Sequence, residues 1–485
     1  MRAINAAVLA TALTIFVAGS DLAQDSGAGL VVQPVPGAPR SMGVYPSQAQ
    51  GQYLGGVTEG TATAGELALS LDEAIQRGLK NNLGTLVNNQ ERRRSEATRR
   101  KVLADLLPSL SARTQRSENQ INLAALGFAN FPGIAPIIGP FGVFDIRGYL
   151  TQRVLDFTSI RNTQSSGQMV QAAEQNYQNS RDTVALVVGG LYLQAVAGES
   201  RVESERTQVT TAEAVYNQAV DYKKSGVIPA IDVLRAQVEL EADRQRFVSA
   251  ENDFQKMKLG LAQAIGLPLG QQIRLSDKLS PESAPAVTLQ QALERAYENR
   301  SDYRSAQFMV KAAEFTRRAA SAERYPTVAA SVDYGTIGQG VTQNHGTFTA
   351  AIGVNIPIYE GGRIEAKVTE ADAVLKQREA ERDALRSRIE FEVRTVFLDL
   401  KSTLDQVTLA GNARSLAETQ VAQARDRFAA GVTTSLEVVQ AQQAQAVASD
   451  NYISSLFNYN LAKGSLARAA GQAEKLFRLF VLGDK

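Results

Sequence analysis

Two long stretches of this chain repeat one another, and this duplication limits the possible folds more than any other feature of the sequence. The segment Leu71–Arg77 (LDEAIQR) aligns with Leu289–Arg295 (LQQALER). The register then holds without a gap until the matching prolines Pro108 and Pro326. Internal repeats of this kind indicate that one supersecondary unit is used twice. The fold should therefore consist of two similar halves.

A second alignment, shifted slightly, covers the rest of each copy. It places the dipeptide Gly226-Val227 onto Gly431-Val432, and it is collinear with the first alignment. Together the alignments predict a first repeat, a second repeat and a C-terminal tail, at residues 69–270, 271–471 and 472–485.

Each copy shows the same predicted order of elements: a helix, two strands around a Gly/Pro-rich loop, a very long helix, a turn and another helix. A helix of about 65 residues spans roughly 100 Å, the combined length of two helices of about 33 residues. Two shorter helices should therefore stack end to end along one long helix in each copy. The predicted helices run over Asp72–Ala104, Ile160–Lys223 and from the turn to Ile265, then over Leu289–Ala322, Arg363–Phe428 and Leu436–Ala470.

The long helices carry apolar residues with coiled-coil spacing, which predicts knobs-into-holes packing. In the second copy the apolar residues step by four and three through Ile389, Val393, Val396, Leu400, Leu404 and Val407. The core of an ordinary soluble bundle would show the same stripe.

Between the helices, the apolar period changes to two, which is typical of strands. Val328 to Tyr334 alternate in this way, whereas Gln152 interrupts the pattern of the first copy. Predicted lengths of about nine to eleven residues fit tilted strands that cross a membrane, although a half-buried soluble strand alternates too. The longest alternating set is Phe348, Ala350, Ile352, Val354, Ile356 and Ile358.

The N-terminus has the features of a secretory signal peptide, which we predict over residues 1–23. Arg2 precedes an apolar run from Ala6 to Ala18, and small residues follow. Residues 24–68, rich in Gly, Pro and Ala, are predicted to form an extended arm or linker. No later segment offers about eighteen uninterrupted apolar residues, so we expect no membrane-spanning helix. A chain of this kind would cross a bilayer with strands closed into a barrel.

Composition argues against catalysis and against nucleic-acid binding. The sequence has no cysteine, and its single histidine, His345, lies among Gly, Asn and Thr. Thiolate chemistry, a Ser-His-Asp triad and a His-rich metal site therefore lack their residues. Fifty-one basic and fifty acidic residues leave a net charge of +1, which gives no basic footprint. We expect no enzyme activity, no cofactor, no metal and no nucleic-acid partner.

Four predicted strands cannot close a barrel, because the outermost strands would keep unpaired N–H and C=O groups in lipid. Several chains would have to share one barrel. Two chains would give eight strands around a filled interior, whereas three would give twelve around an aqueous lumen.

The sequence resembles the outer-membrane efflux protein family of TolC. The resemblance runs from about Leu69 to Gly471 and includes the duplication and the order of elements. It is carried by the strand-to-helix segment Ile356–Arg363 (IPIYEGGR) and by the two turn segments Tyr222–Gln237 (YKKSGVIPAIDVLRAQ) and Phe428–Gln442 (FAAGVTTSLEVVQAQ).

The resemblance implies a mixed α/β membrane protein that forms a homotrimer. A twelve-stranded barrel in the outer membrane would continue as an α-helical coiled-coil tunnel across the periplasm. Its tip would dock on a periplasmic adaptor and an inner-membrane pump. The protein would be a passive exit duct, gated at its periplasmic tip.

The resemblance also places the gate. Asp232 and Glu437 should approach the tunnel axis just beyond the two turns, where their repulsion would favour opening. The family's closing contacts are only partly kept, since Phe428 replaces a tyrosine, Thr433 an arginine and Gln440 an acidic residue. The residues alone also allow both acids to be ordinary first-turn helix residues. The predicted adaptor-docking tips are Gly226, Val227, Gly431 and Val432.

Two alternatives come from other classes of protein. A periplasmic or surface coiled-coil fibre would explain the seams but would leave the alternating segments without a role. A carboxylate-based hydrolase would need a cleft, for which the sequence shows no pattern. Within the channel interpretation, small-molecule efflux and type I protein secretion use the same duct, and both stay open.

Overall fold

The computed structural model describes residues 48–482 of the chain, with gaps at 64, 128–132, 134, 280 and 283–286. All of these residues belong to one compact unit. The predicted signal peptide and the first part of the predicted arm lie outside the described residues.

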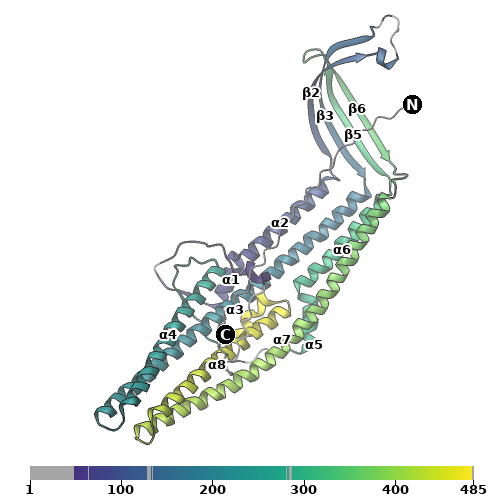
Figure 1. Cartoon of the computed structure of the whole chain (residues 1–485). Coiled ribbons are helices and arrows are strands. Elements are labelled where there is room, and N and C mark those ends of the chain that lie inside the picture. The colour runs from purple at the N-terminus through teal and green to yellow at the C-terminus, as the bar shows by residue number, and fades with distance from the viewer. Residues whose placement is uncertain are drawn as a thin grey trace, which may run out of the picture. The chain divides into compact units, whose positions relative to one another are not determined.

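In the first copy, a short strand is followed by two helices, a β-hairpin, one very long helix and, beyond a turn, a further helix (Figure 1). A 3-10 helix, Gln48–Tyr53, precedes them, and a second, Ala124–Leu126, follows β2. In chain order the elements are β1 (Leu67–Leu69), α1 (Leu71–Asn81), α2 (Leu83–Ala104), β2 (Ser109–Asn122), β3 (Ile137–Leu155), α3 (Phe157–Lys224) and α4 (Ala230–Ala264).

The second copy repeats this order and ends with one additional helix. Its elements are β4 (Ile273–Leu275), α5 (Leu289–Asn299), α6 (Ser301–Ala322), β5 (Thr327–Gly338), β6 (Asn344–Asn355), α7 (Arg363–Ala429), α8 (Ser435–Ala469) and α9 (Ala473–Leu482).

The first predicted helix of each copy is in fact two helices. Asn82 separates α1 from α2, and Arg300 separates α5 from α6. Asn82 has an extended backbone, its Oδ1 accepts the N–H of Gly84 at 2.9 Å, and its Nδ2 donates to the carbonyl of Ala264 at 3.1 Å. The break follows from this buried amide, because a side chain that caps a new helix cannot continue the old one.

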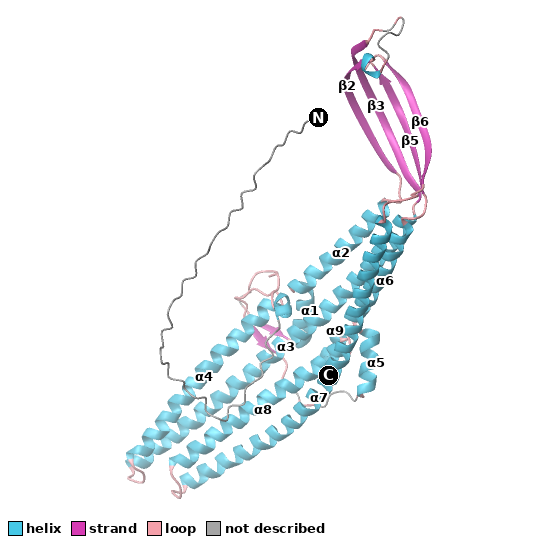
Figure 2. Cartoon of the chain, turned by 45° about the vertical axis from the view of Figure 1, so that its right-hand side comes forward, coloured by secondary structure: helices cyan, strands magenta, loops and turns pink. Residues whose placement is uncertain are grey.

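Helices form a layer with the sheet at one end and the α3–α4 and α7–α8 turns at the other (Figures 1 and 2). Nearer the sheet, the contacts run α2, α3, α6, α7; nearer the turns, they run α4, α3, α8, α7. The predicted stacking of shorter helices along one long helix is therefore confirmed for α2 and α4 along α3, and for α6 and α8 along α7. The short helices α1 and α5 were not predicted as separate elements.

The main apolar core lies where the two copies meet, around the middle of α3. Phe477 of α9 fills a notch there, because a Cβ on Gly189 or on Gly464 would come within 2.4 Å or 2.3 Å of its ring. Residues predicted as a plain tail thus form an integral helix. Part of the predicted arm is also ordered, since Tyr53 packs over Gly84.

The sheet is antiparallel in the order β2-β3-β5-β6, so the hairpins of the two copies join at β3 and β5. The four strands hold 14, 19, 12 and 12 residues, longer than predicted. Ile356 and Ile358, predicted to continue the last strand, lie beyond its end at Asn355. Among the described residues, β2 and β6 each pair along one edge only.

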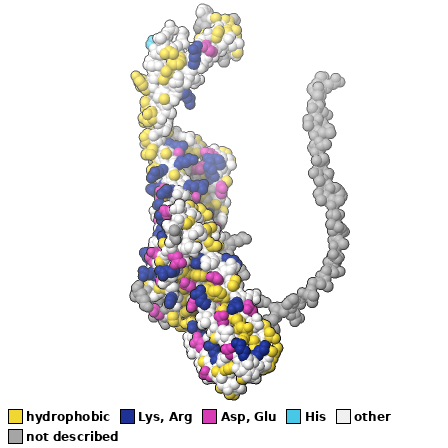
Figure 3. Space-filling model, turned by 90° about the vertical axis from the view of Figure 1, so that its left-hand side faces the viewer, with side chains coloured by type: hydrophobic (Ala, Val, Ile, Leu, Met, Phe, Trp, Pro, Cys, Tyr) yellow, Lys and Arg dark blue, Asp and Glu magenta, His cyan; other side chains and the backbone are white. Residues whose placement is uncertain are grey.

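The predicted alternation gives the sheet two different faces. One face is mainly apolar, although Arg116 and Gln152 also lie on it, paired with Phe144 and Ala330. A row of directly paired apolar residues crosses all four strands on this face: Leu110, Leu150, Val332 and Ala350. The next row lies on the opposite face and is polar or amphipathic: Ser111, Tyr149, Asp333 and Thr349. In Figure 3, hydrophobic side chains gather over the strands, whereas charged side chains of both signs are interspersed over the helices.

One helix bears on the expectation that the chain has no membrane-spanning helix. Among the described residues, α3 includes an eighteen-residue stretch apolar enough by composition to cross a membrane. In the fold, 56% of that stretch is buried, and it contributes Val184, Val188 and Tyr192 to the main core. Its apolar character is accounted for by packing.

Candidate functional site: the helix turns and the sheet

Two glycines end the long helices in the same way. Gly226 has φ 73° and Gly431 has φ 72°, in the left-handed region that favours glycine. The N–H of Val227 donates to the carbonyl of Tyr222 at 2.8 Å, and the N–H of Val432 donates to that of Arg427 at 3.0 Å. This six-to-one bond is the Schellman closure of a helix. The two turns are therefore equivalent structures in the two copies.

The two turns are held together by an aromatic contact. The rings of Tyr222 on α3 and Phe428 on α7 lie 5.6 Å apart, and Phe428 is 1% exposed. The hydroxyl of Tyr222 donates to the backbone carbonyl of Ala429 at 3.0 Å. The helices α3 and α4 form one helical hairpin, and α7 and α8 form the other. The contact between Tyr222 and Phe428 therefore joins the two helical hairpins next to their turns.

Asp232 contributes a second link between the hairpins. Its side chain is buried at the start of α4, where Oδ1 accepts the hydroxyl of Ser435 at 3.2 Å and a guanidinium N–H of Arg235 at 3.2 Å. Ser435 is the first residue of α8. The structure places the Asp232 carboxylate between the two helical hairpins of one protomer. Its approach to a tunnel axis stays a prediction.

Glu437, at the equivalent place in the second copy, is more open. Its carboxylate accepts the hydroxyl of Thr433 and lies 3.4 Å from a guanidinium nitrogen of Arg427. Gln440 is exposed one turn further along α8. The structure does not join Glu437 to Asp232, so the two predicted gate acids have different surroundings.

Apolar side chains are exposed around both turns. Val227 is 59% exposed and Val432 is 70% exposed, and the neighbouring Ile231 and Leu436 are exposed as well. Exposed apolar groups at the end of a helical layer are typical of a surface that another protein covers. No group of three or more His, Asp or Glu side chains could hold a metal ion anywhere in the described ranges.

Sequence reasoning missed three residues of this site: Tyr222 as a hydrogen-bond donor, Ser435 as the partner of Asp232, and Arg427 as the partner of Glu437. Tyr222 stands four residues before Gly226, and Arg427 stands four before Gly431. Equal spacing from the turn glycine in both copies was the signal that could have identified Tyr222 and Arg427, whereas no such signal marks Ser435.

At the other end of the unit, the polar face of the sheet carries an ion-pair cluster. Arg147 lies 2.5 Å from Asp145 and 3.2 Å from Asp333, which belongs to the other copy. The two sheet faces thus suit different surroundings, one apolar and one aqueous. The free edges of β2 and β6 still require hydrogen-bonding partners.

Comparisons with known proteins agree with this geometry. Residues 292–472 match the Outer membrane efflux protein family. Outer membrane efflux protein BepC of Brucella suis biovar 1 (strain 1330) is 26% identical over 248 residues, which cover 50% of this chain and 47% of that protein. The alignment therefore spans about half the length of this relative.

Solved structures share the fold over most of the chain. The Campylobacter jejuni CmeC outer membrane channel superposes with a TM-score of 0.74 at 14% identity, covering 90% of this chain and 93% of that one. A membrane protein of Pseudomonas aeruginosa gives a TM-score of 0.72 at 17% identity, with coverage of 86% and 97%. The open state of the Neisseria gonorrhoeae MtrE outer membrane channel gives 0.63 at 18% identity, with coverage of 84% and 89%. These matches confirm the predicted family resemblance and the mixed α/β fold.

Proposed function

We propose that this chain, a member of the outer membrane efflux protein family, is the outer-membrane exit duct of a tripartite efflux or type I secretion system. Three copies would form a twelve-stranded barrel that continues as an α-helical tunnel into the periplasm. The periplasmic end would meet an adaptor protein and, with it, an inner-membrane pump. The chain would act as a passive conduit and not as an enzyme.

The observation that carries this proposal is the four-stranded sheet with two free edges and two unlike faces. An open edge cannot remain unpaired in lipid, so β2 of one copy must pair with β6 of the next. Four strands from each of three copies give twelve, enough to leave an aqueous lumen. The apolar row through Leu150 and Val332 would then face lipid, and the row through Tyr149 and Asp333 would face water.

The helix turns support a gate at the opposite end. The contacts from Tyr222 to Ala429 and from Ser435 to Asp232 hold the two hairpins of one copy together. A buried apolar cluster that includes Val233 and Phe428 also lies between the hairpins, so separating them would break both hydrogen bonds and expose this cluster. Glu437, the more open acid, is the residue that we assign to a cation-attracting ring.

The exposed apolar side chains at the turns support the adaptor contact. Val227 and Val432 occupy equivalent turns, so a trimer would present six similar apolar knobs. A partner with a repeated helical tip could contact all six.

The test is to fractionate membranes of the host bacterium and reconstitute the purified protein. We expect a trimer in the outer-membrane fraction that migrates differently before and after heating, and that forms conducting pores in planar bilayers. A soluble periplasmic protein that forms fibres, without conductance, would instead support the coiled-coil alternative. Drug sensitivity and the secreted proteins of a deletion strain would distinguish efflux from protein secretion.

A further inference from the structure

The half of the helical layer nearer the sheet contains a cavity that the site at the helix turns does not use. Its volume is about 640 Å³, and it is lined by all four helices of that half, α2, α3, α6 and α7. A cavity of this size can hold a small organic molecule, since ligand sites typically enclose about 300 to 1,000 Å³.

Close packing of α3 against α6 forms the floor of the cavity. Ala172 on α3 and Ala312 on α6 both line it and are each 2% exposed. The hydroxyl of Ser165 donates to the carbonyl of Ala312 at 2.9 Å, and the hydroxyl of Ser305 donates to the carbonyl of Ala172 at 3.1 Å. Because these side chains are small, the space beside the contact stays open between the flanking helices α2 and α7.

Flexible apolar side chains form part of the cavity wall. Met169, Met309 and Val374 come from α3, α6 and α7 and are 52%, 37% and 42% exposed. At ~1.5 Å per residue, all three lie about 16 to 20 Å from the ends of their helices at the sheet. Thioether side chains adapt to differently shaped partners, so this wall suits apolar bodies of various shapes.

One acidic side chain of the cavity has no counterion. The ammonium of Lys367 lies 2.7 Å from a carboxylate oxygen of Glu323, and the guanidinium of Arg378 lies 2.7 Å from Glu381. Both basic groups of the lining therefore have an acid of their own. In the part of the chain that the structure describes, Glu370 makes no ion pair, although it is exposed in the cavity.

The lining therefore has an excess of negative charge. Its remaining charged side chain is Glu91 on α2, which lies 3.3 Å from Arg94 at the surface. Glu370 lies about 10 Å from the start of α7, which places it roughly 6 to 10 Å closer to the sheet than the apolar wall. A cationic group and an apolar body separated by this distance would fit the two parts of the cavity.

The cavity opens on the face of the layer that α1 and α9 do not cover. Val188 and Tyr192 of α3 belong to the core beneath α1 and α9. At about 100° per residue, the lining residues Met169 and Asn176 point about 100° or more away from them. In a tube built from three copies, α1 and α9 would block the passage if they lay inside. They must lie outside, and the cavity then faces the lumen.

We propose that this cavity is a binding site inside the duct for amphipathic organic cations, small molecules with one cationic group and an apolar body. The cationic group lies at Glu370, and the body lies against Met169, Met309 and Val374. The inference rests on the proposed function, because the cavity must face the lumen, and it names the class of molecule that the duct would hold. Because Glu370 is exposed, the ion pair is weak and a bound molecule can leave again.

Protection of an engineered cysteine gives a local test, because the chain has no cysteine of its own. The reporter is Asn162→Cys, at an exposed lining position about 8 Å from the start of α3. The probes are (1-naphthylmethyl)trimethylammonium, 1-naphthylmethanol and 1-naphthylmethanesulfonate, which share one apolar body and differ in charge. In outer-membrane fragments, labelling by an uncharged, water-soluble maleimide should be slowed most by the ammonium, less by the alcohol and least by the sulfonate.

Two variants in the reporter background separate the two parts of the site. Glu370→Gln should raise the half-protecting concentration of the ammonium about threefold and leave that of the alcohol unchanged, because only the ammonium loses an ionic partner. Met309→Gln, which makes the wall polar at similar size, should raise the half-protecting concentration of both probes.

Each measurement has a matched control. Asp399→Asn removes an exposed acid from the same helix, about 44 Å further from the sheet than Glu370, and should not change protection. Gln164→Cys places a reporter at the same height on α3 but about 200° around the helix, and the probes should not slow its labelling.

The outcomes separate the cavity from the proposed function. Outer-membrane trimers in which no probe protects Asn162→Cys would overturn the site and leave the duct intact. Equal protection by the ammonium and the sulfonate, equal effects of Glu370→Gln and Asp399→Asn, or equal slowing at both reporter positions would also overturn it. Absence of outer-membrane trimers and of conductance for the unmodified chain would instead reject the proposed function.

Discussion

Arg300 occupies, at the break between α5 and α6, the position that Asn82 occupies at the break between α1 and α2. Asn82 uses a neutral amide that bonds to backbone carbonyls. Arg300 uses a buried guanidinium that lies 2.7 Å from Asp302 and 2.7 Å from Glu392 on α7. The same break in the fold is therefore built from unlike chemistry in the two copies.

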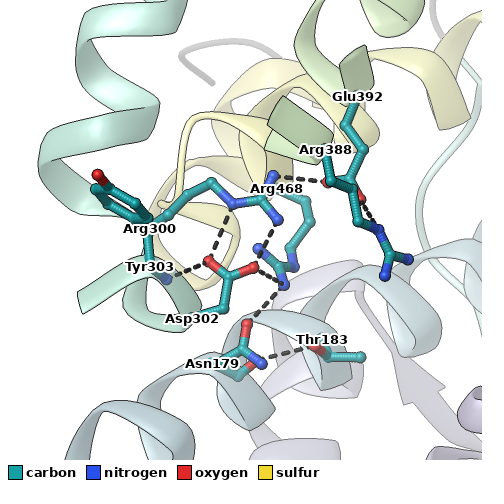
Figure 4. Close-up of polar contacts among 8 residues, drawn as sticks. All are labelled: Asn179, Thr183, Arg300, Asp302, Tyr303, Arg388, Glu392 and Arg468. Atoms are coloured by element: carbon teal, nitrogen blue, oxygen red, sulfur yellow. Dashed lines mark hydrogen bonds and ion pairs between the residues drawn. The ribbon is translucent and has the colours of Figure 1, made fainter. Parts of the chain in front are cut away.

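Figure 4 shows how this charge is balanced. Asp302 lies between Arg300 and Arg468, and Arg468 donates to the side-chain oxygen of Asn179 at 2.6 Å. Burial alone would raise the pKa of Asp302, but the hydrogen bond and charge of Arg300 hold it below its ordinary value. The ionised cluster thus connects α3, α6, α7 and α8.

Arg300→Met should destabilise the protein by about 3 kcal/mol, because it leaves a buried carboxylate with fewer partners. The loss should appear as a lower thermal midpoint by circular dichroism in detergent. The pKa of Asp302 is depressed, so the contribution of this pair is present above about pH 4 and is lost as the pH falls through the folded pKa. Arg388→Ala is the control, since Arg388 contacts Glu392 from an exposed position and should change stability by less than about 1 kcal/mol.

Tyr222→Phe should favour the open state of the proposed gate. It removes the hydrogen bond to Ala429 but keeps the ring contact with Phe428. Loss of about 1 kcal/mol corresponds to roughly a fivefold change in the ratio of open to closed pores. Single-channel recordings would show longer or more frequent open events. Tyr216→Phe, on the same helix, should leave the recordings unchanged; equal effects of both variants would remove Tyr222 from the gate.

Glu437→Ala should reduce the preference of the proposed pore for cations, since it removes the more open acid from each copy in the proposed trimer. Reversal potentials measured under a salt gradient would shift toward zero. Glu241→Ala, which removes an exposed acid elsewhere on a hairpin, should not produce this shift. An unchanged reversal potential for Glu437→Ala would reject its assignment to the cation ring.

Gly226→Val combined with Gly431→Val should abolish export while leaving trimers in the outer membrane. A β-branched residue at positive φ costs about 1 to 2 kcal/mol at each turn, which would reshape the proposed adaptor-docking tips. Export assays and outer-membrane fractionation should be made on the same cells. Gly260→Val is the control, because that glycine lies inside α4 with open space around it. Loss of the trimers would mean that the turn glycines serve folding instead.

Because of Lys463, the free energy of unfolding should depend on pH in the alkaline range. Its ammonium is buried and donates to the carbonyls of Glu282 and Val481, and burial lowers its pKa from 10.5 to about 8 although the charge of Glu282 opposes the shift. Between about pH 8 and 10.5 the unfolded chain binds the proton that the folded chain has released, so stability rises with pH across this window.

The Lys463→Met variant has no ammonium group at this position, so its stability should not rise with pH across this window. The comparison requires thermal midpoints of both proteins at pH 7.5 and pH 10. An identical pH dependence of the two midpoints would contradict the assignment.

The sequence by itself determined the features that depend on local periodicity and on single backbone conformations. The repeat, the long helices, the alternating faces of the sheet and the turns at Gly226 and Gly431 all follow from residue spacing and from the freedom of glycine at positive φ. Two of the three segments that carry the family resemblance lie at those same turns.

Only the tertiary structure decided which side chains meet across the two copies. The break at Asn82 depends on a carbonyl at residue 264, and the burial of Asp232 depends on Ser435 in the other hairpin. The docking of Phe477 against Gly189 and Gly464 likewise joins residues far apart in the chain. Such contacts depend on how the helices pack, and no local pattern encodes the partner.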